Sequence, residues 1–311
     1  MVVQPTGAGP VTQGRYSTRQ RWTGIVATMV AVVVFIVPFL FTALMAVKNK
    51  KQASLQDFSW PSEWLFWQNL SEVLSTRNYM LLLAYFNSTL ITVGAVTLLI
   101  LFGAMVGYVL QRRQSAWNKV IFGCVLAGLI IPPAVVPTIW VLQGLNLFKT
   151  IHGMIFIQVA YGLAFSVLLY RSFISTIPRD LDEAAIIDGA TPWQVFYRVI
   201  LPLLKPVTVT LIVVQSIAIF NDFTNPLYYL PGRENVTVQL TLFNFQTQFQ
   251  SQFNLLFMNI LLVTIPPLIV FIFFNRPNVA SPWSFNPTRF TPTFRCATTS
   301  ALACRWPDCP R

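Results

Sequence analysis

Side chains able to take part in chemistry are sparse in this chain, and the densest group of charged ones lies between residues 177 and 206. Lys, Arg, Asp and Glu make up only 10% of the 311 residues. Hydrophobic runs flank the charged stretch on both sides. We expect such a polar segment to meet a soluble partner and receive force from it, rather than to catalyse a reaction. Its charged residues are Arg179, Asp180, Asp182, Glu183, Asp188, Arg198 and Lys205.

Other kinds of chemical site are not indicated. Cys296, Cys304 and Cys309 lie far along the chain from His152, the single histidine, and the set matches no zinc-binding spacing. His152 has no obvious catalytic neighbours in the sequence. The chain also contains no G-x-x-x-x-G-K-S/T loop, which would cradle nucleotide phosphates. We therefore predict that the chain is not an enzyme and itself binds neither a metal nor a cofactor.

The composition is that of a membrane protein. Hydrophobic residues make up 55% of the chain, and the mean hydropathy is +0.60. A soluble domain is about 45–50% apolar and about 25% charged. The net charge of +11 could suggest nucleic acid in a soluble protein, but in a membrane protein it more often reflects Lys and Arg kept on the cytoplasmic side. We therefore expect a multi-pass membrane protein that contacts lipid and no nucleic acid.

Six apolar runs are long enough to cross a bilayer, which predicts an all-α integral membrane protein with a six-span domain over residues 23–276. The third run is interrupted by Pro132, Pro133 and Pro137, which remove backbone hydrogen bonds. Lipid tolerates such a break only where neighbours or water satisfy the freed carbonyls, so we expect this part to face the bundle interior. The six runs cover residues 24–47, 81–110, 120–148, 151–170, 203–223 and 253–274.

The distribution of Lys and Arg predicts the side of the membrane on which each loop lies. With six spans both termini share one side, and that side holds 15 of the 21 Lys and Arg residues. The positive-inside bias therefore places the termini and the charged stretch in the cytoplasm. Lys48, Lys50 and Lys51 count against this orientation, because they would lie close to the opposite membrane surface.

The charged stretch carries the signals of two short helices joined by a turn. Pro178 suits a first helical turn, and the acidic residues after it favour the positive end of the helix dipole. Gly189 fits a left-handed C-terminal cap. Thr191 and Gln194 then have the spacing of a capping box, which starts a second helix. We expect both helices to lie across the cytoplasmic ends of the spans.

Three interpretations of this segment are open. Its cap chemistry is common in ordinary amphipathic loops. Ala185, Gly189 and Val195 also have the spacing of a DNA-binding helix-turn-helix. The second helix, however, carries only Arg198 as a cation, and phosphate contacts need several. The third interpretation, a docking element for a motor subunit, is the one that the order of residues favours.

The segment resembles the EAA signature of membrane subunits of binding-protein-dependent ATP-binding cassette importers. A Glu-Ala-Ala triplet at 183–185 is followed after three residues by Gly189, and after nine more by Val199-Ile200-Leu201-Pro202, with Val199 where the pattern usually has Ile. The resemblance extends over about residues 20–276. In this range the chain is similar to the carbohydrate branch of the family, which includes the maltose and glycerol-phosphate permeases. The other matching segments are Asn87-Ser88, Ile130-Ile131-Pro132-Pro133, Arg171-Ser172-Phe173, Ile177-Pro178, Asp188-Gly189-Ala190 and Phe220-Asn221-Asp222-Phe223.

This resemblance implies a permease subunit of an ATP-driven importer of sugars, polyols or glycerol-phosphate compounds, forming half of the translocation pathway. Such a subunit pairs with a second permease as a heterodimer and with two copies of an ATPase, which uses ATP and Mg²⁺. An extracytoplasmic solute-binding protein delivers the substrate. The resemblance also implies the plasma (inner) membrane of a bacterium or archaeon.

The resemblance further implies that the EAA helix, within residues 177–202 and between the fourth and fifth spans, is a coupling helix moved by the ATPase. Glu183 would pair with a basic group of the ATPase. The small side chains of Ala184 and Ala185 would let the helix enter a cleft, and Gly189 would make the turn. The expected coupling residues are Glu183, Ala184, Ala185, Asp188, Gly189, Leu201 and Pro202.

Polar and proline residues in or near the spans are candidates for the translocation pathway. Asn87 lies near the start of the second run, and Asn221 and Asp222 lie at the far end of the fifth. An ionisable residue at membrane depth is a functional candidate, although Asp222 lies near enough to the outer surface that a structural role is equally open. Pro132 and Pro133 complete the expected pathway set. Side chains that could contact a sugar are Trp140, Gln143, Gln215, Asn221 and Tyr228.

The remaining segments carry weaker signals. Residues 1–22 predict a disordered cytoplasmic tail, and residues 277–311 an atypical, disordered C-terminal tail with no assigned function. An aromatic cluster at 58–67 favours an interfacial helix or, alternatively, a docking surface for an external partner.

Two other classes of function are open for the whole chain, an integral-membrane enzyme and a stand-alone secondary transporter driven by ions.

Overall fold

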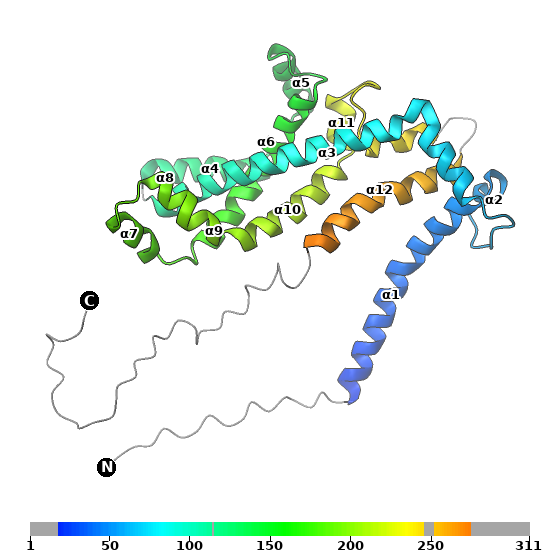
Figure 1. The fold of residues 1–311 in the computed structure, drawn as a ribbon, viewed down its shortest axis with the longest axis horizontal. Coiled ribbons are helices and arrows are strands. Elements are labelled where there is room, and N and C mark those ends of the chain that lie inside the picture. The colour runs from blue at the N-terminus through cyan, green and yellow to red at the C-terminus, as the bar shows by residue number, and fades with distance from the viewer. Residues whose placement is uncertain (1–17, 114, 246–251, 275–311) are drawn as a thin grey trace.

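The computed structural model describes residues 18–113, 115–245 and 252–274, and every regular element in these ranges is a helix. Figure 1 shows α7 and α8 gathered at one end of the bundle and α2 at the other. The elements in chain order are α1 (Thr18–Val47), α2 (Lys50–Ser54), α3 (Phe66–Arg112), α4 (Ala116–Ile130), α5 (Val135–Gly144), α6 (Ile151–Ile174), α7 (Asp180–Ile187), α8 (Pro192–Gln194), the π-helix η1 (Val195–Ile200), α9 (Leu201–Leu203), α10 (Lys205–Phe220), α11 (Thr224–Tyr229), the 3₁₀-helix η2 (Gln239–Phe245) and α12 (Phe253–Phe274).

Four of the described helices are long and apolar enough to cross a membrane by themselves, namely α1 from Trp22 onward, α3, α6 and α12. Two further pairs of helices are long and apolar enough to cross a membrane only when the two helices of each pair are taken together, because a bend separates them. α4 and α5 meet at 117°, and the helical run Pro192–Leu203 meets α10 at 71°. The all-helical prediction is therefore confirmed for the described residues, and the structure supports four to six spans.

The interruption predicted in the third span is confirmed, and it separates two helices, α4 and α5. Pro132 and Pro133 have no backbone N–H, and a residue before proline is pushed toward extended conformation. Ile131 has φ −73° and ψ 122°, which ends α4. Both prolines are exposed in the isolated chain, and no residue of α4 is buried. The expectation that this region faces the interior of the chain's own bundle is wrong.

The second predicted span is confirmed as the straight part of α3. Arg77, Asn78 and Tyr79 have positive φ angles of 51°, 64° and 60°, which interrupt the right-handed helix. The uninterrupted apolar part of α3 therefore starts at Met80, next to the predicted boundary of the 81–110 run.

Close packing of α3 against α6 forms the centre of the bundle. A Cβ atom placed on Gly103 would lie 2.9 Å from Ser166 Cβ, and one on Gly107 would lie 2.9 Å from Tyr170 Cβ. These glycines let the two helices approach closely, as small residues do in membrane bundles. The buried Tyr170 hydroxyl also shares a hydrogen bond of 3.0 Å with the Thr208 hydroxyl, which joins α10 to the same pair.

A network of polar side chains fastens the end of α1 to the bundle. The Lys48 ammonium is fully buried and donates to the Asp57 carbonyl at 2.7 Å, to the Asp57 carboxylate at 3.0 Å and to the Ser59 hydroxyl at 3.1 Å. The Asn69 amide of α3 donates to the Lys48 carbonyl at 3.1 Å, and the Asn254 amide of α12 donates to Asn69 Oδ1 at 3.0 Å. The end of α1 is thereby bound to both α3 and α12.

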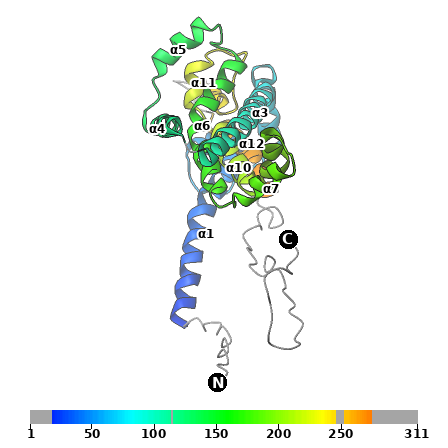
Figure 2. The ribbon, with the colours of Figure 1, turned by 90° about the vertical axis from the view of Figure 1, so that its left-hand side faces the viewer.

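The rest of α1 stands away from the bundle in both views (Figures 1 and 2), and its residues from Trp22 to Leu40 are exposed. Because α1 begins at Thr18, residues 18–22 of the predicted tail are helical. Residues 1–17 and the predicted tail at 277–311 lie outside the described residues.

Three residues of the aromatic cluster, Phe58, Trp60 and Trp64, lie in a loop rather than in the expected interfacial helix, since residues 57–65 have no helical assignment. Phe66 and Trp67 begin α3. Trp60 and Trp64 are 77% and 67% exposed. The loop is nevertheless held in place, because Asp57 and Ser59 bind the buried Lys48 ammonium. Its role as a membrane anchor or a docking surface stays a prediction.

Candidate functional site

The charged segment forms short helical pieces at one end of the bundle (Figure 1). α7 begins at Asp180, two residues after Pro178, so the proline precedes the first turn instead of occupying it. Asp180, Asp182 and Glu183 fill the first turn, as the helix-dipole argument predicts. The helix then packs against η1, which follows in the same segment.

Gly189 ends α7 in the predicted left-handed conformation, with φ +83°. The Ala190 N–H donates to the Ala185 carbonyl at 3.0 Å, and the Gly189 N–H donates to the Ile186 carbonyl at 3.0 Å. This pair of hydrogen bonds is a Schellman motif, which satisfies carbonyls that the helix end leaves free. A Cβ on Gly189 would meet nothing within 4 Å, so the demand for glycine is conformational rather than steric.

The second helix starts at the predicted capping box and continues as a π-helix. The Thr191 N–H donates to Gln194 Oε1 at 2.8 Å, and the Gln194 N–H donates to Thr191 Oγ1 at 3.4 Å. In η1 the Leu201 N–H bonds to the Phe196 carbonyl, five residues back. Pro202 follows and has no N–H for an α-helical bond, which favours the wider turn. Leu201 is half-buried and Pro202 is exposed.

The expected coupling residues of α7 lie on its open side. Glu183, Ala184 and Asp188 are exposed, whereas Ala185 is half-buried and packs against the hydrophobic core. Apolar side chains are also exposed on this short helix, which is typical of an interaction surface. Sequence reasoning missed them, although their placement among charged residues was a usable signal. They are Leu181, Ile186 and Ile187, with exposed fractions of 42%, 58% and 84%.

Asp182 is the acidic residue of α7 that turns into the bundle, and sequence reasoning missed its role. Its Oδ2 lies 2.7 Å from Arg112 Nε at the end of α3, with side chains only 12% and 11% exposed. An Arg112 N–H also donates to the Pro178 carbonyl at 3.4 Å. Burial raises the pKa of the Asp182 carboxyl, and the Arg112 guanidinium opposes that rise. The ion pair fixes the start of α7 to α3.

The candidates for the translocation pathway have structural partners of their own. Asn87 is buried, and its amide donates to the Val236 carbonyl at 3.1 Å, which binds the loop before η2 to α3. Asn221 is exposed and accepts a hydrogen bond of 3.0 Å from the Gln239 amide. The proline pair lies at the exposed break between α4 and α5. A part for any of them in transport stays a prediction.

Asp222 belongs to a polar cluster. Its Oδ2 accepts hydrogen bonds of 2.6 Å from the Gln158 amide of α6 and from the Asn225 amide, and its Oδ1 accepts one of 3.2 Å from the Asn225 N–H. One turn along α6, the Tyr161 and Tyr229 hydroxyls share a hydrogen bond of 3.1 Å. Sequence reasoning found Asp222 but missed Gln158, whose position inside an apolar run was the available signal.

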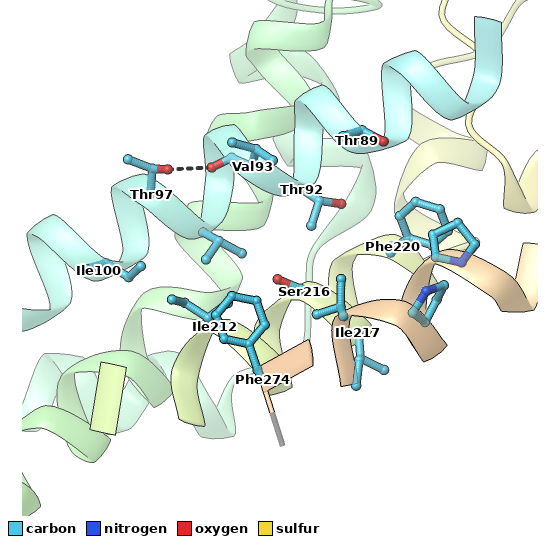
Figure 3. A pocket seen from close by; sticks show the side chains of 14 residues that line it. Thr89, Thr92, Val93, Thr97, Ile100, Ile212, Ser216, Ile217, Phe220 and Phe274 are labelled. Carbon is cyan, nitrogen blue, oxygen red and sulfur yellow. Dashed lines mark hydrogen bonds between the residues drawn. The ribbon is translucent and has the colours of Figure 1, made fainter. Parts of the chain in front are cut away.

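A cavity of about 370 Å³ opens between α3, α10 and α12 (Figure 3). Thr92 of α3 and Ser216 of α10 line it, and the buried Thr92 hydroxyl has no hydrogen-bond partner among the described residues. The Thr97 hydroxyl donates to the Val93 carbonyl at 2.7 Å. Thr89 adds one more hydroxyl, and the rest of the lining is aliphatic and aromatic, so the cavity suits an apolar group better than a sugar.

The side chains named for sugar contact lie on α5, α10 and α11 or just after α10. Gln215 is buried on α10, and the other four are exposed, namely Trp140, Gln143, Asn221 and Tyr228. Within the described ranges, no group of three or more His, Cys, Asp and Glu side chains is placed to hold a metal ion.

Comparison with known proteins gives concordant matches. Residues 99–277 match the family described as binding-protein-dependent transport system inner membrane component. The diacetylchitobiose uptake system permease protein NgcG of Streptomyces coelicolor is 30% identical over 249 residues, which cover 78% of this chain and 81% of that protein. The melibiose/raffinose/stachyose import permease protein MelC of Bacillus subtilis is 30% identical over 264 residues, which cover 82% and 92%.

A solved structure shares the fold. One chain of a bacterial ABC transporter involved in the import of the acidic polysaccharide alginate superposes with a TM-score of 0.71 at 21% sequence identity, over 83% of this chain and 97% of that one.

The family match spans more than half of the chain and includes the whole EAA segment, which confirms the resemblance. Permease subunits of this kind are not catalytic, and the ATPase is a separate subunit. They work with a solute-binding protein, as the family description states. The membrane-enzyme and ion-driven alternatives are left without support. The chain belongs to the inner-membrane permease components of binding-protein-dependent ABC transport systems.

Proposed function

We propose that this permease subunit forms half of the translocation pathway of a sugar importer and is coupled to its ATPase through α7. The relatives NgcG and MelC carry oligosaccharide substrates in their names, and the permease protein MsmG of Streptococcus mutans is named for a multiple sugar-binding transport system. These names favour a sugar over the polyols and glycerol-phosphate compounds also considered. The observation that carries the coupling proposal is the exposed face of α7, held between the Gly189 cap and the buried Asp182 ion pair.

α7 is suited to receive a push, because it is short, open on one side and anchored on the other. Glu183 and Ala184 are exposed, which leaves the carboxylate free to pair with a basic group of the ATPase and leaves little bulk beside it. Asp182 is bound to Arg112, so a displacement of α7 would pull on the end of α3. The same displacement would reach α10 through η1 and α9, which meet α10 at 71°.

The orientation that we propose places α7 and both termini in the cytoplasm. Most Lys and Arg residues then lie on the α7 side, in line with the positive-inside bias. α2 lies at the opposite end of the bundle in Figure 1 and would face outward, with the 55–65 loop beside it. Six spans follow if each of the two bent helix pairs crosses the membrane once.

The proposed pathway lies between this chain and a second, different permease. The exposed break at Pro132 and Pro133 would then face that partner, which could satisfy the freed carbonyls. Asn87, Asn221 and Asp222 remain the proposed pathway residues of this chain. Carboxylate and amide groups can exchange hydrogen bonds with sugar hydroxyls. Two ATPase copies and one solute-binding protein complete the proposed assembly.

The test is ATP-driven uptake in vesicles that contain this chain with its second permease, ATPase and solute-binding protein. Glu183→Gln should insert normally and hydrolyse ATP, but take up little labelled oligosaccharide per ATP. Glu63→Gln is the matched control, because Glu63 is an exposed carboxylate in the loop before α3. Equal uptake by both variants would remove the coupling role of Glu183. Failure of the wild type to take up any oligosaccharide, with uptake of a polyol instead, would reject the sugar assignment.

A further inference from the structure

A strongly basic cleft of about 640 Å³ lies where α3 ends, α4 begins, α6 ends and α7 is about to begin. Four cations line it, and no carboxylate is among its lining residues. Such a concentration of positive charge creates a local potential that attracts an anion. The polar lining consists mainly of Arg113, Lys119, Arg171 and Arg179, with Gln111 and Asn118.

The four cations are not neutralised by the rest of the described chain. None of them lies within 4 Å of a carboxylate oxygen of a described residue. The positive charge of Arg179 acts to lower the pKa of the Asp182 carboxyl. The ion pair of Asp182, however, is with Arg112, which does not line the cleft. The positive charge of the cleft is therefore available to a ligand.

Two of the cations are held in position by neutral groups. Arg171 Nε donates to Gln111 Oε1 at 3.3 Å, and its guanidinium lies over the Phe122 ring, 3.6 Å from the centroid. Arg179 donates to the Gln111 carbonyl at 3.5 Å. A guanidinium fixed in this way keeps spare N–H donors in a planar fork, which matches the oxygens of a phosphate.

The cleft opens beside an apolar helix flank. α4 begins at the cleft and buries none of its side chains. Trp117, Val120 and Ile121 are 75%, 57% and 46% exposed along its first turns. An aromatic residue at the membrane surface with aliphatic residues beyond it suits a phospholipid, whose headgroup is polar and whose chains are apolar. A soluble anion or an acidic protein segment would leave this flank unused.

We propose that the cleft binds the phosphate headgroup of an anionic phospholipid, whose acyl chains lie along α4. Basic pockets between membrane helices are suited to such headgroups. The bound phosphate bridges the ends of α3 and α6 to Arg179, the residue that precedes α7. It thereby steadies the same junction that the Arg112–Asp182 ion pair holds. This site depends on neither the transported substrate nor the ATPase.

The experiment uses the full-length chain in phosphatidylcholine nanodiscs that contain about one fifth phosphatidylglycerol, and native mass spectrometry counts the lipids retained. The test variant is Arg113→Gln/Arg179→Gln, in which both side chains are exposed, so packing is preserved. Arg113→Lys/Arg179→Lys keeps the charge. Lys205→Gln is the matched control, because Lys205 is an exposed cation at the start of α10, outside the cleft.

The wild type and the control should retain phosphatidylglycerol in preference to phosphatidylcholine. Each removed charge should lower that preference about fivefold at low ionic strength, so the Gln pair should lose it about 25-fold and the Lys pair should keep most of it. Equal retention by the Gln pair and the control would overturn the proposal. A second measurement compares the thermal stabilisation of the wild type by phosphatidylglycerol with that by inorganic phosphate. Equal stabilisation by the two would also overturn the proposal, because it would assign the cleft to free phosphate. The ATPase is then added to the same nanodiscs. If the Gln pair no longer binds the ATPase but retains as much lipid as the wild type, the cleft belongs to a protein partner instead.

Discussion

Replacing Gly189 with alanine should impair coupling through the backbone alone. Gly189 has φ +83°, and the added Cβ would meet no atom within 4 Å. An L-residue with a side chain pays about 1–2 kcal/mol in the left-handed region, because Cβ approaches its own carbonyl oxygen. The hydrogen bonds to the Ala185 and Ile186 carbonyls form only when residue 189 has this left-handed conformation. The alanine substitution therefore destabilises the capped end of α7 by the full amount of about 1–2 kcal/mol.

The penalty sets the size of the expected effect. A shift of 1–2 kcal/mol changes a conformational ratio by about 5- to 30-fold. If coupling requires the capped turn, the oligosaccharide taken up per ATP hydrolysed should fall by up to that factor in Gly189→Ala. Gly189→Asn should lose less, because Asn enters the left-handed region more readily than other residues with a side chain.

The assay compares uptake and ATP hydrolysis in the same vesicles for Gly189→Ala and Gly123→Ala. Gly123 is a matched control, since its added Cβ also meets nothing within 4 Å but it lies inside α4 without a left-handed φ. Gly123→Ala should be neutral or slightly stabilising. Uptake by Gly189→Ala equal to that of Gly123→Ala would refute the reasoning about the turn.

Three further predictions concern packing and charge. Arg112→Gln leaves the buried Asp182 carboxylate without its partner and should cost about 1–3 kcal/mol of unfolding free energy near pH 7, less than a fully buried pair because both side chains keep some exposure. Burial raises the pKa of the Asp182 carboxyl above its ordinary value, so this loss of unfolding free energy should shrink as the pH falls through that raised pKa and the carboxyl becomes neutral. Chemical denaturation at several pH values checks this, and an unchanged loss at acid pH would contradict it. Asp57→Ala should lower the thermal unfolding temperature more than Lys48→Met, because the lysine is the buried partner and Asp57 can return to water; the reverse order would contradict the assignment. Gly107→Ala should lower the free energy of unfolding by about 1–3 kcal/mol, because the added Cβ would lie 2.9 Å from the Tyr170 Cβ of α6. Thermal unfolding checks this, and an unchanged stability would disprove the close approach of the two helices.

Features that depend on local hydrogen bonds could be predicted from the sequence. The turn at Gly189 and the capping box at Thr191 join residues at most five positions apart, so residue types at fixed spacing carry the information. The apolar runs likewise predicted the helices, because burial in lipid requires continuous hydrophobicity.

Features that depend on distant partners could not be predicted in this way. Asp182 pairs with Arg112 and Asp222 with Gln158, residues far apart along the chain, and no local pattern distinguishes a buried carboxylate from an exposed one. The prolines of the third run predicted a break but not its angle of 117°, since the direction after a break depends on which surfaces pack there. The exposure of α4 was missed for the same reason.

The coupling role of α7 is tested most directly by chemical cross-linking of its open face in the complete transporter. With the native cysteines replaced by serine, Ala184→Cys places a thiol on the exposed side of α7, and Ile130→Cys places one at the far end of α4, where Ile130 is 81% exposed. A short thiol-reactive cross-linker is added during ATP turnover, and products with the ATPase are resolved on gels. We predict that Ala184→Cys is joined to the ATPase and that Ile130→Cys is not. An intact, ATP-hydrolysing complex in which Ala184→Cys gives no such product would contradict the account.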